Sequence, residues 1–189
     1  METINKDQVS GLQNKIALHR DMQAYQQLYK ILHKPLIRFA TSMIDSKEVA
    51  EEIFSDLMLK IWHMEEKLAA IESLNVYLFR SIRNASLNYL QKNNRVRLVE
   101  LNDGVNDKAG TGFLQDEVLR NEFQSHLLHA VEALPPRCKM VYLLIKEEGM
   151  TYRQVSDVLG ITVNTIEGHM TVALKRITQC LRTYLNSGY

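Results

Sequence analysis

The stretch TYRQVSDVLGITVNTIEGHMTVALKRI, residues 151–177, carries the clearest structural pattern in the chain. Thr151 is followed three residues later by Gln154, a capping-box pair that predicts the start of a helix. Gly160 lies where this helix must end, a position that favours a left-handed backbone. Thr162 is placed to cap a second helix. The stretch therefore predicts a short helix, a tight turn and a longer helix.

Apolar residues recur at helical spacing along both predicted helices. Val155 and Leu159 form the inner edge of the first helix, and Ser156 is small where the second helix must cross closely. The predicted buried side of the second helix consists of Ile166, Met170, Ala173, Leu174 and Ile177. Two such helices around a glycine-containing turn are typical of a DNA-binding helix-turn-helix. An ordinary helical hairpin inside a core is the alternative interpretation.

In a helix-turn-helix, the first part of the second helix faces base edges in the major groove. The residues predicted to lie there are Asn164, Thr165, Glu167, Gly168, Thr171 and Val172. Glu can accept a hydrogen bond from cytosine, Thr can bond to a base or contact the thymine methyl, and Gly168 allows close backbone approach. The residues better placed for phosphates, where charge adds affinity without sequence information, are Lys175, Arg176 and Arg153.

Outward from this motif, the chain divides into two helical modules. Helices are predicted over residues 121–133 and from Pro136, in a favourable first-turn position, to Lys146. Residues 98–120 lose periodicity and are rich in Gly, Asn and Asp, which predicts a flexible linker. The predicted organisation is an N-terminal tail (1–20), a first domain (21–97), the linker (98–120) and a second domain (121–189). The expected fold class is all-α, with two small helical domains.

Three amphipathic helices are predicted in the first domain, beginning near Ala24, Lys47 and Ser73. Pro35 is expected to break or kink the first of them. The second has a broad apolar face and an acidic opposite side. Trp62 and Phe79 are expected to pack in the core.

Charge is distributed unevenly, although the formal net charge is only +1. Residues 45–72 hold eight acidic residues against three lysines, whereas residues 80–97 hold five basic residues and no acid. One face of the third helix presents Arg80, Asn84, Asn88, Gln91 and Arg95, with Arg83 and Lys92 beside it. Surfaces of opposite sign indicate two different partners, with plain solvated surfaces as the alternative.

Composition excludes several classes of protein. The chain is 46% apolar and 24% charged, which is typical of a folded globular protein. It lacks a signal-like N-terminus and any long apolar run, so we expect a cytoplasmic protein without membrane insertion. Cys138 and Cys180 lack a CxxC partner and are expected to be reduced, structural thiols. No HExxH or glycine-rich phosphate loop occurs, and His126 with His129 is the nearest approach to a ligand pair. We therefore expect no metal, no cofactor and no enzymatic activity.

Three segments together with the helix-turn-helix resemble the extracytoplasmic-function group of sigma-70-type RNA polymerase sigma factors. The segments are AEEIFSDLMLKIW (50–62), YLFRSIRNASLNYL (77–90) and LPPRCKMVYLL (134–144). Their order and spacing both agree with that group, and the similarity is greatest to its iron-transport-regulator type, expanded in Bacteroidetes. The main alternative is a stand-alone regulator of the response-regulator output type, which shares this helix-turn-helix. A helical-bundle enzyme or metal protein is the other alternative.

The resemblance implies a role for each part. The acidic helix would dock on the clamp helices of the largest polymerase subunit through Glu51, Glu52, Ser55, Asp56 and Lys60. The second domain would contact the flap of the second-largest subunit and read the minus-thirty-five element of promoter DNA. The basic helix and the loop over residues 67–74 would recognise and melt the minus-ten element through Tyr77, Arg80, Arg83, Asn84, Asn88, Gln91, Lys92 and Arg95. An anti-sigma factor, often membrane-anchored in this group, would cover the same surfaces.

Several residues depart from the group's pattern. Ser55 stands where Gln is common, Asn88 where Asp is common, and Gln91 where Arg is common. Met58 replaces a usual Phe, and Tyr77 replaces a Trp found in many relatives, so its ring can either stack on a base or pack in the core. These departures leave the promoter preference and the details of polymerase contact open.

Overall fold

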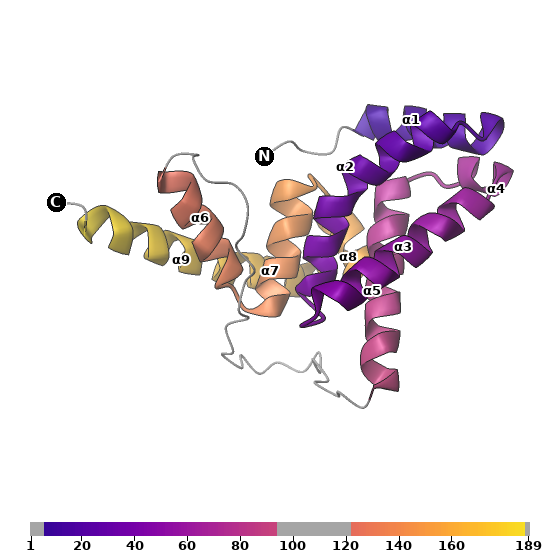
Figure 1. The fold of residues 1–189 in the computed structure, drawn as a ribbon. Coiled ribbons are helices and arrows are strands. Elements are labelled where there is room, and N and C mark those ends of the chain that lie inside the picture. Colours follow the sequence, from indigo (N-terminus) through magenta and orange to yellow (C-terminus); the bar gives the residue numbers. More distant parts are fainter. Residues whose placement is uncertain (1–5, 94–121, 188–189) are drawn as a thin grey trace.

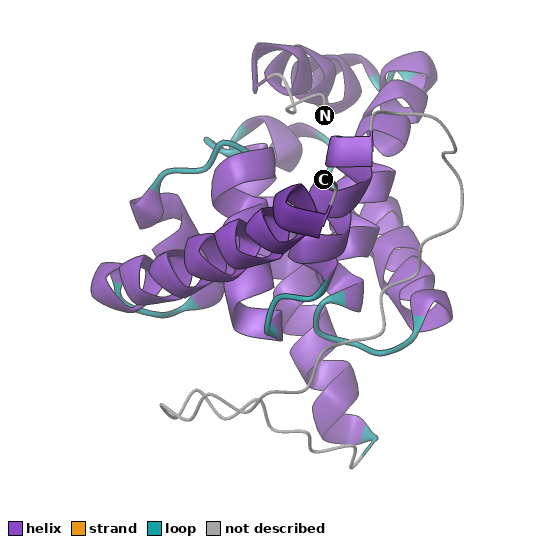
Figure 2. Cartoon of the chain, turned by 90° about the vertical axis from the view of Figure 1, so that its left-hand side faces the viewer, coloured by secondary structure: helices purple, strands orange, loops and turns teal. Residues whose placement is uncertain are grey.

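Helices form all of the regular structure in the computed structural model, which describes residues 6–93 and 122–187 (Figure 1 and Figure 2). The first module contains α1 (Lys6–His19), α2 (Met22–Thr41), α3 (Lys47–His63), α4 (Glu66–Ala69) and α5 (Leu74–Lys92). The second contains α6 (Glu122–Glu132), α7 (Pro136–Tyr142), a π-helical turn η1 (Leu143–Glu147), α8 (Tyr152–Leu159) and α9 (Val163–Ser187). The predicted all-α fold class is confirmed. The predicted linker lies outside the described residues.

Side-chain caps set the beginnings of α2 and α3 in the first module. The carboxylate of Asp21 accepts hydrogen bonds from the backbone N–H of Gln23 and Ala24, which starts α2. α2 continues through Pro35, so the predicted break does not occur, and the alternative of a kink stays a prediction. The flanking residues Leu32 and Leu36 are fully buried, so packing against the core offsets the hydrogen bond that proline cannot donate.

Aromatic side chains from three helices form the centre of the first module. Phe39 of α2, Phe54 of α3 and Phe79 of α5 are almost completely buried. The rings of Phe39 and Phe79 meet edge to face with centroids 5.2 Å apart, a geometry that adds to the energy of burial. The prediction that Phe79 belongs to the core is confirmed.

Residues 1–20, predicted to form a tail, include a helix that packs into the first module. α1 lies against α2, α4 and α5, and its Val9, Leu12 and Ile16 are buried in the core. Only a narrow apolar stripe marks this helix in the sequence, and the buried polar residue Gln13 interrupts it. The weak periodicity explains why the sequence pattern did not predict α1.

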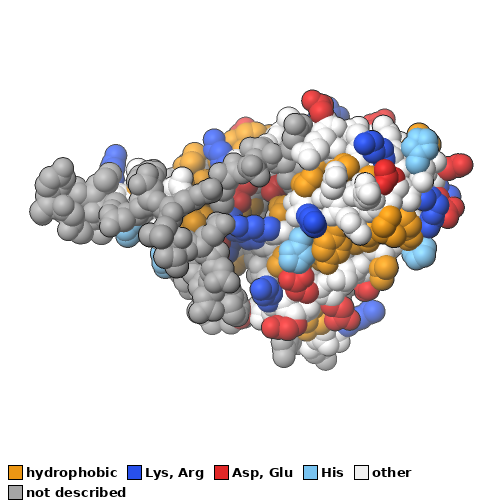
Figure 3. Space-filling view, turned by 45° about the horizontal axis from the view of Figure 1, so that its top comes forward, with side chains coloured by type: hydrophobic (Ala, Val, Ile, Leu, Met, Phe, Trp, Pro, Cys, Tyr) orange, Lys and Arg blue, Asp and Glu red, His pale blue; other side chains and the backbone are white. Residues whose placement is uncertain are grey.

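The face that carries α1 has a mixed surface. Figure 3 shows charged side chains of both signs scattered among hydrophobic ones on this side of the molecule. Leu18 near the end of α1 and Met22 at the start of α2 are both more than half exposed. This surface differs from α5, whose sequence contains no acidic residue.

The two modules pack against each other. One hydrophobic core contains residues of α1–α5 together with Val141 and Leu144, Val155 and Leu159, and Met170 from the second module. In Figure 1, α7 and α8 lie beside α2 and α5, whereas α6 and the end of α9 extend away from them. A second, smaller cluster joins α6, α7 and α9. The helix-turn-helix is therefore held against the first module.

An ion-pair network also joins the modules. Arg38 of α2 pairs with Glu147 of η1 at 2.6 Å and with Glu132 of α6 at 3.0 Å. Lys139 of α7 makes a second ion pair with Glu132. Each of these four side chains is less than one fifth exposed, so the charges are weakly screened by solvent.

Candidate nucleic-acid interface

The helix-turn-helix begins with the predicted capping box. The Gln154 backbone N–H donates to Thr151 Oγ1 at 3.2 Å, and the Thr151 N–H donates to Gln154 Oε1 at 3.0 Å. Gly160 ends α8 at φ +65°, the left-handed conformation that its position predicted. The hydroxyl of Thr162 accepts from the Thr165 N–H at 3.2 Å and starts α9. Each of these local predictions is confirmed.

One residue of the predicted buried side of α9 faces solvent instead. Ile166, Met170, Ala173 and Ile177 are buried as predicted, but Leu174 is 45% exposed. At about 100° of rotation per residue, Leu174 lies about 70° around the helix from the middle of this apolar stripe. The prediction for Leu174 was wrong because spacing of three and four also admits the edge of the stripe.

The surface predicted to face DNA bases is largely open. Glu167 and Gly168 lie three and four residues after Asn164 and four and three before Thr171, so these four residues share one face of α9, and all are exposed. Thr165 and Val172 at the edges of this surface are half-buried. The Thr171 hydroxyl donates to the backbone carbonyl of Glu167 at 2.9 Å, which leaves its methyl group and oxygen lone pairs outward.

Three basic residues flank this surface at the positions predicted to contact phosphate. Arg153 on α8 and Lys175 on α9 are exposed, and Arg176 is half-buried. Exposed cations therefore lie on both helices of the motif.

A second polar surface runs along α5. Arg80, Asn84, Asn88 and Gln91 are exposed on the same helix, with Lys92 beside them at its end. The structure thus places these predicted residues together in a stripe without an acid. The remaining predicted residue of this stripe, Arg95, lies outside the described residues.

Arg83 differs from the other cations of α5 because the second module covers it. A Cβ atom placed on Gly160 would lie only 3.6 Å from Arg83 Nη2, so the guanidinium rests against the turn of the helix-turn-helix. Burial, together with the neighbouring charge of Arg80, lowers the pKa of the Arg83 guanidinium. Part of the predicted minus-ten surface is therefore closed off by the predicted minus-thirty-five module.

The loop before α5 is held in place by α1. Gln13, which is 5% exposed, donates from Nε2 to the backbone carbonyls of Leu68 and Ile71, each at 2.8 Å. Sequence reasoning missed Gln13, since a single glutamine in a helix carries no signal that its amide will meet a loop. The loop was predicted to form the pocket for a minus-ten base, so α1 braces a candidate functional element.

Two aromatic residues singled out in the sequence are half-buried. Tyr77 is half-buried, with its hydroxyl 3.8 Å from the Met64 sulfur and its ring 5.8 Å from Lys60 Nζ. Trp62 is also only half-buried: its ring meets Tyr25 edge to face, and the Arg20 guanidinium lies 4.6 Å above it. Trp62 therefore packs at the edge of the core rather than inside it.

The acidic surface predicted to bind polymerase lies on α3. Its members Glu52, Ser55, Asp56 and Lys60 are exposed on this helix. Glu51 is half-buried and pairs with His33 Nε2 of α2 at 2.8 Å. Four of the five predicted docking residues are thus open to a partner, and the fifth is partly engaged within the module.

Neither cysteine forms a disulfide in the structure. Cys138 is buried, and burial raises the pKa of its thiol, as expected of a structural residue. Cys180 is also free, as predicted, but it is exposed on α9 and so lacks the burial expected of a structural thiol. Within residues 6–93 and 122–187, no group of three His, Cys, Asp or Glu side chains could hold a metal ion. In the same part of the chain, no helix is both long and apolar enough to cross a membrane.

Both polar surfaces lie within matches to protein-family models. The model for sigma-70 region 2 matches residues 28–96, which include α3 and α5, and the model for sigma-70 region 4 matches residues 126–177, which include the helix-turn-helix. The chain belongs to the sigma-70 family. As an RNA polymerase sigma factor, it combines the two regions in one chain, which does not favour the alternative of a response-regulator output domain.

Solved sigma-factor structures share the fold of this sigma factor. CnrH, solved in complex with the cytosolic domain of CnrY, is 18% identical with a TM-score of 0.55, and the match covers 94% of this chain and 99% of that chain. The sigma factor RpoE from Bartonella quintana, solved with the anti-sigma factor NepR, is 22% identical with a TM-score of 0.58, covering 85% and 98%. No curated protein sequence matches the chain.

Proposed function

We propose that this sigma factor directs core RNA polymerase to a specific class of promoters through three separate helical surfaces. In this proposal α3 docks on polymerase, α5 binds and melts the minus-ten element, and α9 reads the minus-thirty-five element. The observation that carries the proposal is the exposed stripe of cationic and amide side chains on α5, free of acid, within the region 2 match. An acid-free stripe attracts the DNA backbone, which is uniformly anionic.

Melting requires no covalent chemistry in this proposal. Exposing a base costs a few kcal/mol of stacking, which binding recovers if a pocket holds the base and cations hold the backbone. Arg80 and Lys92 supply cations, and Asn84, Asn88 and Gln91 supply amides that both donate and accept. The loop over residues 67–74, braced by Gln13, supports the proposal because a pre-organised pocket pays less entropy on binding.

Polymerase docking is assigned to the exposed acidic side of α3. Glu52 and Asp56 lie one turn apart on that helix, with Ser55 between them. We assign this surface to the clamp helices of the largest subunit and the second module to the flap of the second-largest subunit. In reading DNA, Glu167 and Asn164 would contact base edges while Arg153 and Lys175 hold phosphates.

Promoter binding requires the two modules to separate. Arg83 cannot hold the minus-ten strand while its guanidinium rests against Gly160. We infer that the packed arrangement is a resting state, and that an anti-sigma partner, like those solved with similar sigma factors, binds the free protein. The extracytoplasmic-function group, a membrane-anchored partner and a place in the bacterial cytoplasm belong to the same proposal.

Run-off transcription tests the proposed function. Purified protein and core polymerase from the same bacterium are combined on fragmented genomic DNA, and transcripts are mapped at their 5′ ends. The expected result is a set of start sites that share two upstream elements and are absent with core alone. Transcripts no different from those of core alone would refute the proposal.

Charge variants test the assignment of the two surfaces. Reversing Asp56 and Glu52 should weaken binding to core more than DNA melting by the reconstituted enzyme, whereas removing the charges of Arg80 and Lys92 should do the opposite. Glu51 is a poor choice for charge reversal, because the substitution would also break its ion pair with His33. An effect on folding would then be mixed with the effect on polymerase binding. Equal effects of both pairs in both assays would contradict the division.

A further inference from the structure

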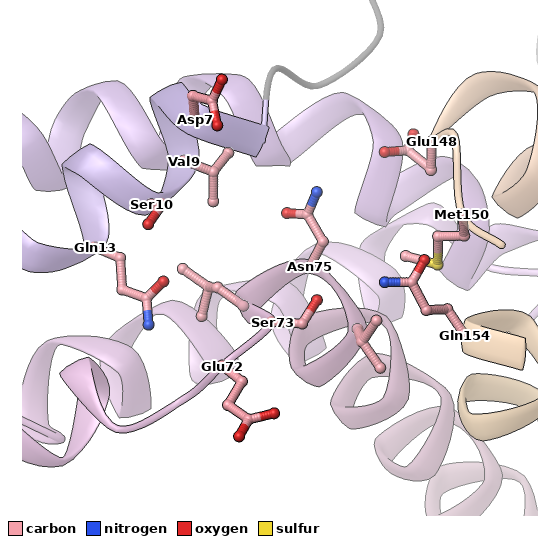
Figure 4. A pocket seen from close by; sticks show the side chains of 12 residues that line it. Asp7, Val9, Ser10, Gln13, Glu72, Ser73, Asn75, Glu148, Met150 and Gln154 are labelled. Carbon is pink, nitrogen blue, oxygen red and sulfur yellow. The ribbon is translucent and has the colours of Figure 1, made fainter.

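A cavity lies where α1, the start of α5 and the turn before α8 come together (Figure 4). Its volume is about 220 Å³, and both modules contribute to its wall. It is separate from the stripe on α5 and from the base-facing side of α9. Neither the match to region 2 nor that to region 4 assigns a ligand to it.

Two almost fully buried polar side chains that line this cavity each carry an oxygen atom without a hydrogen-bond partner in the protein. Glu148 is 6% exposed and Asn75 is 7% exposed, and both line the wall. Glu148 Oε2 and Asn75 Oδ1 accept no hydrogen bond from any protein group. Figure 4 shows the two side chains directed into the same space from opposite modules. Buried acceptors without donors are costly, so the cavity suits a ligand that brings donors.

The charged side chains that line the cavity are all acidic. Asp7 of α1 and Glu72 before α5 line it together with Glu148, and no Lys, Arg or His is among the described residues that form its wall. Val9, Leu74 and Met150 supply an apolar part of the lining. An acidic cavity with apolar walls matches a cation carried on an aliphatic stem.

We propose that this cavity binds a guanidinium group, either on a small molecule or on an arginine side chain of a partner peptide. A guanidinium carries five N–H donors in one plane, so it can reach the Glu148 carboxylate and the Asn75 carbonyl oxygen together. An ammonium has the same charge, but its three N–H donors all radiate from a single nitrogen atom instead of lying in one extended plane. Neutralising Glu148 also relieves its repulsion with the adjacent Glu147.

Binding at this position would hold the modules together. The wall combines α1 and α5 of the first module with Glu148, Met150 and Gln154 of the second. A ligand that needs both parts binds only the packed arrangement and stabilises it by mass action. The inference concerns the free protein and does not depend on the proposed promoter function.

Calorimetric titration of the full chain at about pH 8 tests the proposal with two guanidinium probes. Agmatine represents a free small molecule and N-acetyl-argininamide represents a peptide side chain. We expect saturable one-to-one binding of at least one probe. Binding of agmatine alone would assign the site to a small molecule. Binding of N-acetyl-argininamide would assign it to an arginine side chain of a peptide. N-acetyl-citrullinamide and putrescine, which lack the guanidinium, should bind at least about tenfold more weakly.

Variants locate the binding. Glu148→Gln keeps the shape of the side chain and should weaken probe binding at least about tenfold, as should Asn75→Leu. Glu66→Gln on exposed α4 makes the same acid-to-amide change outside the cavity and should leave the affinity unchanged. Circular dichroism of each variant confirms folding. No binding of either probe up to about 10 mM, equal binding of putrescine, or an unaffected Glu148→Gln variant would overturn the proposal.

Discussion

The Arg83 guanidinium of α5 rests against Gly160 in the turn of the helix-turn-helix, where an added Cβ would lie 3.6 Å from Nη2. This contact joins a predicted minus-ten cation to the module predicted to read the minus-thirty-five element. Glycine suits the position because φ is +65°, whereas a Cβ there would make only an ordinary van der Waals contact with the guanidinium. Arg83 thus packs the two modules together in the free protein, whereas the proposed function assigns the same residue to DNA binding.

Arg83→Ala should loosen the modules as well as weaken melting. Loss of the guanidinium exposes the turn after α8, so backbone amides of α8 should exchange hydrogen about three- to tenfold faster. Hydrogen-exchange mass spectrometry of the free protein measures this change. Arg80→Ala is the matched control, because Arg80 lies on the same helix but is exposed. It should reduce melting while exchange in α8 stays as in the wild type; faster exchange in both variants would contradict the role given to Arg83.

Gln13→Ala should release the loop before α5. The substitution leaves the carbonyls of Leu68 and Ile71 without their buried donor, at a cost of about 1–3 kcal/mol. We expect faster hydrogen exchange across residues 67–74 and weaker binding of single-stranded minus-ten DNA by the reconstituted enzyme, with core binding preserved. Asn14→Ala, at the exposed neighbouring position, is the control. Unchanged DNA binding despite a loosened loop would show that bracing does not matter for recognition.

Much of the fold followed from patterns within single helices. The capping box of Thr151 and Gln154, the glycine at the end of α8 and the apolar stripe of α9 are local features, and each one was predicted because its geometry depends on neighbouring residues. The exposed stripe of α5 was predicted for the same reason. The more specific resemblance, to the iron-transport-regulator type, remains a prediction.

Contacts between distant segments could not be predicted in this way. The Gln13 bonds of α1 and the Arg38 network join residues 55 to 109 positions apart, and no periodicity predicts such pairings. The uninterrupted α2 shows the same limit, because tertiary packing there overrides the local effect of Pro35. Module packing, and with it the cover over Arg83, is visible only in three dimensions.

Removing the Arg38 side chain should separate the modules. Arg38→Met leaves the Glu147 carboxylate buried without its cation, which typically costs about 3–5 kcal/mol for a fully buried pair and somewhat less at this exposure. Small-angle scattering should show a larger radius of gyration, and urea unfolding a lower free energy.

A second substitution distinguishes charge from packing. Adding Glu147→Gln to Arg38→Met removes the stranded charge and should restore part of the stability, which defines the coupling between the two residues. Glu65→Gln breaks the exposed pair with Arg20 and should change stability by less than about 1 kcal/mol. No recovery in the double variant would mean that the network contributes through packing alone.

Glu148 should make the stability of the free protein depend on pH. Burial, with repulsion from Glu147, raises the pKa of its carboxyl to about 7 from 4.5, while Arg38 of α2 acts in the opposite direction. Asp7 and Glu72 line the same cavity and add negative charge near it. Between pH 4.5 and 7 the folded protein therefore holds a proton that the unfolded chain has released. The contribution of Glu148 to the free energy of unfolding is therefore complete below pH 4.5 and is lost as the pH rises through 7.

Glu148→Gln removes this dependence because the amide stays neutral at every pH. Chemical unfolding at about pH 5 and pH 8 should give similar stabilities for variant and wild type at the lower pH, and a more stable variant at the higher, by up to about 3 kcal/mol. Glu66→Gln, which is exposed, should follow the wild-type profile. Since the same variant should bind guanidinium probes more weakly, a gain in stability with a loss of binding separates ligand recognition from folding. A Glu148→Gln profile parallel to that of the wild type would place the titration on another group.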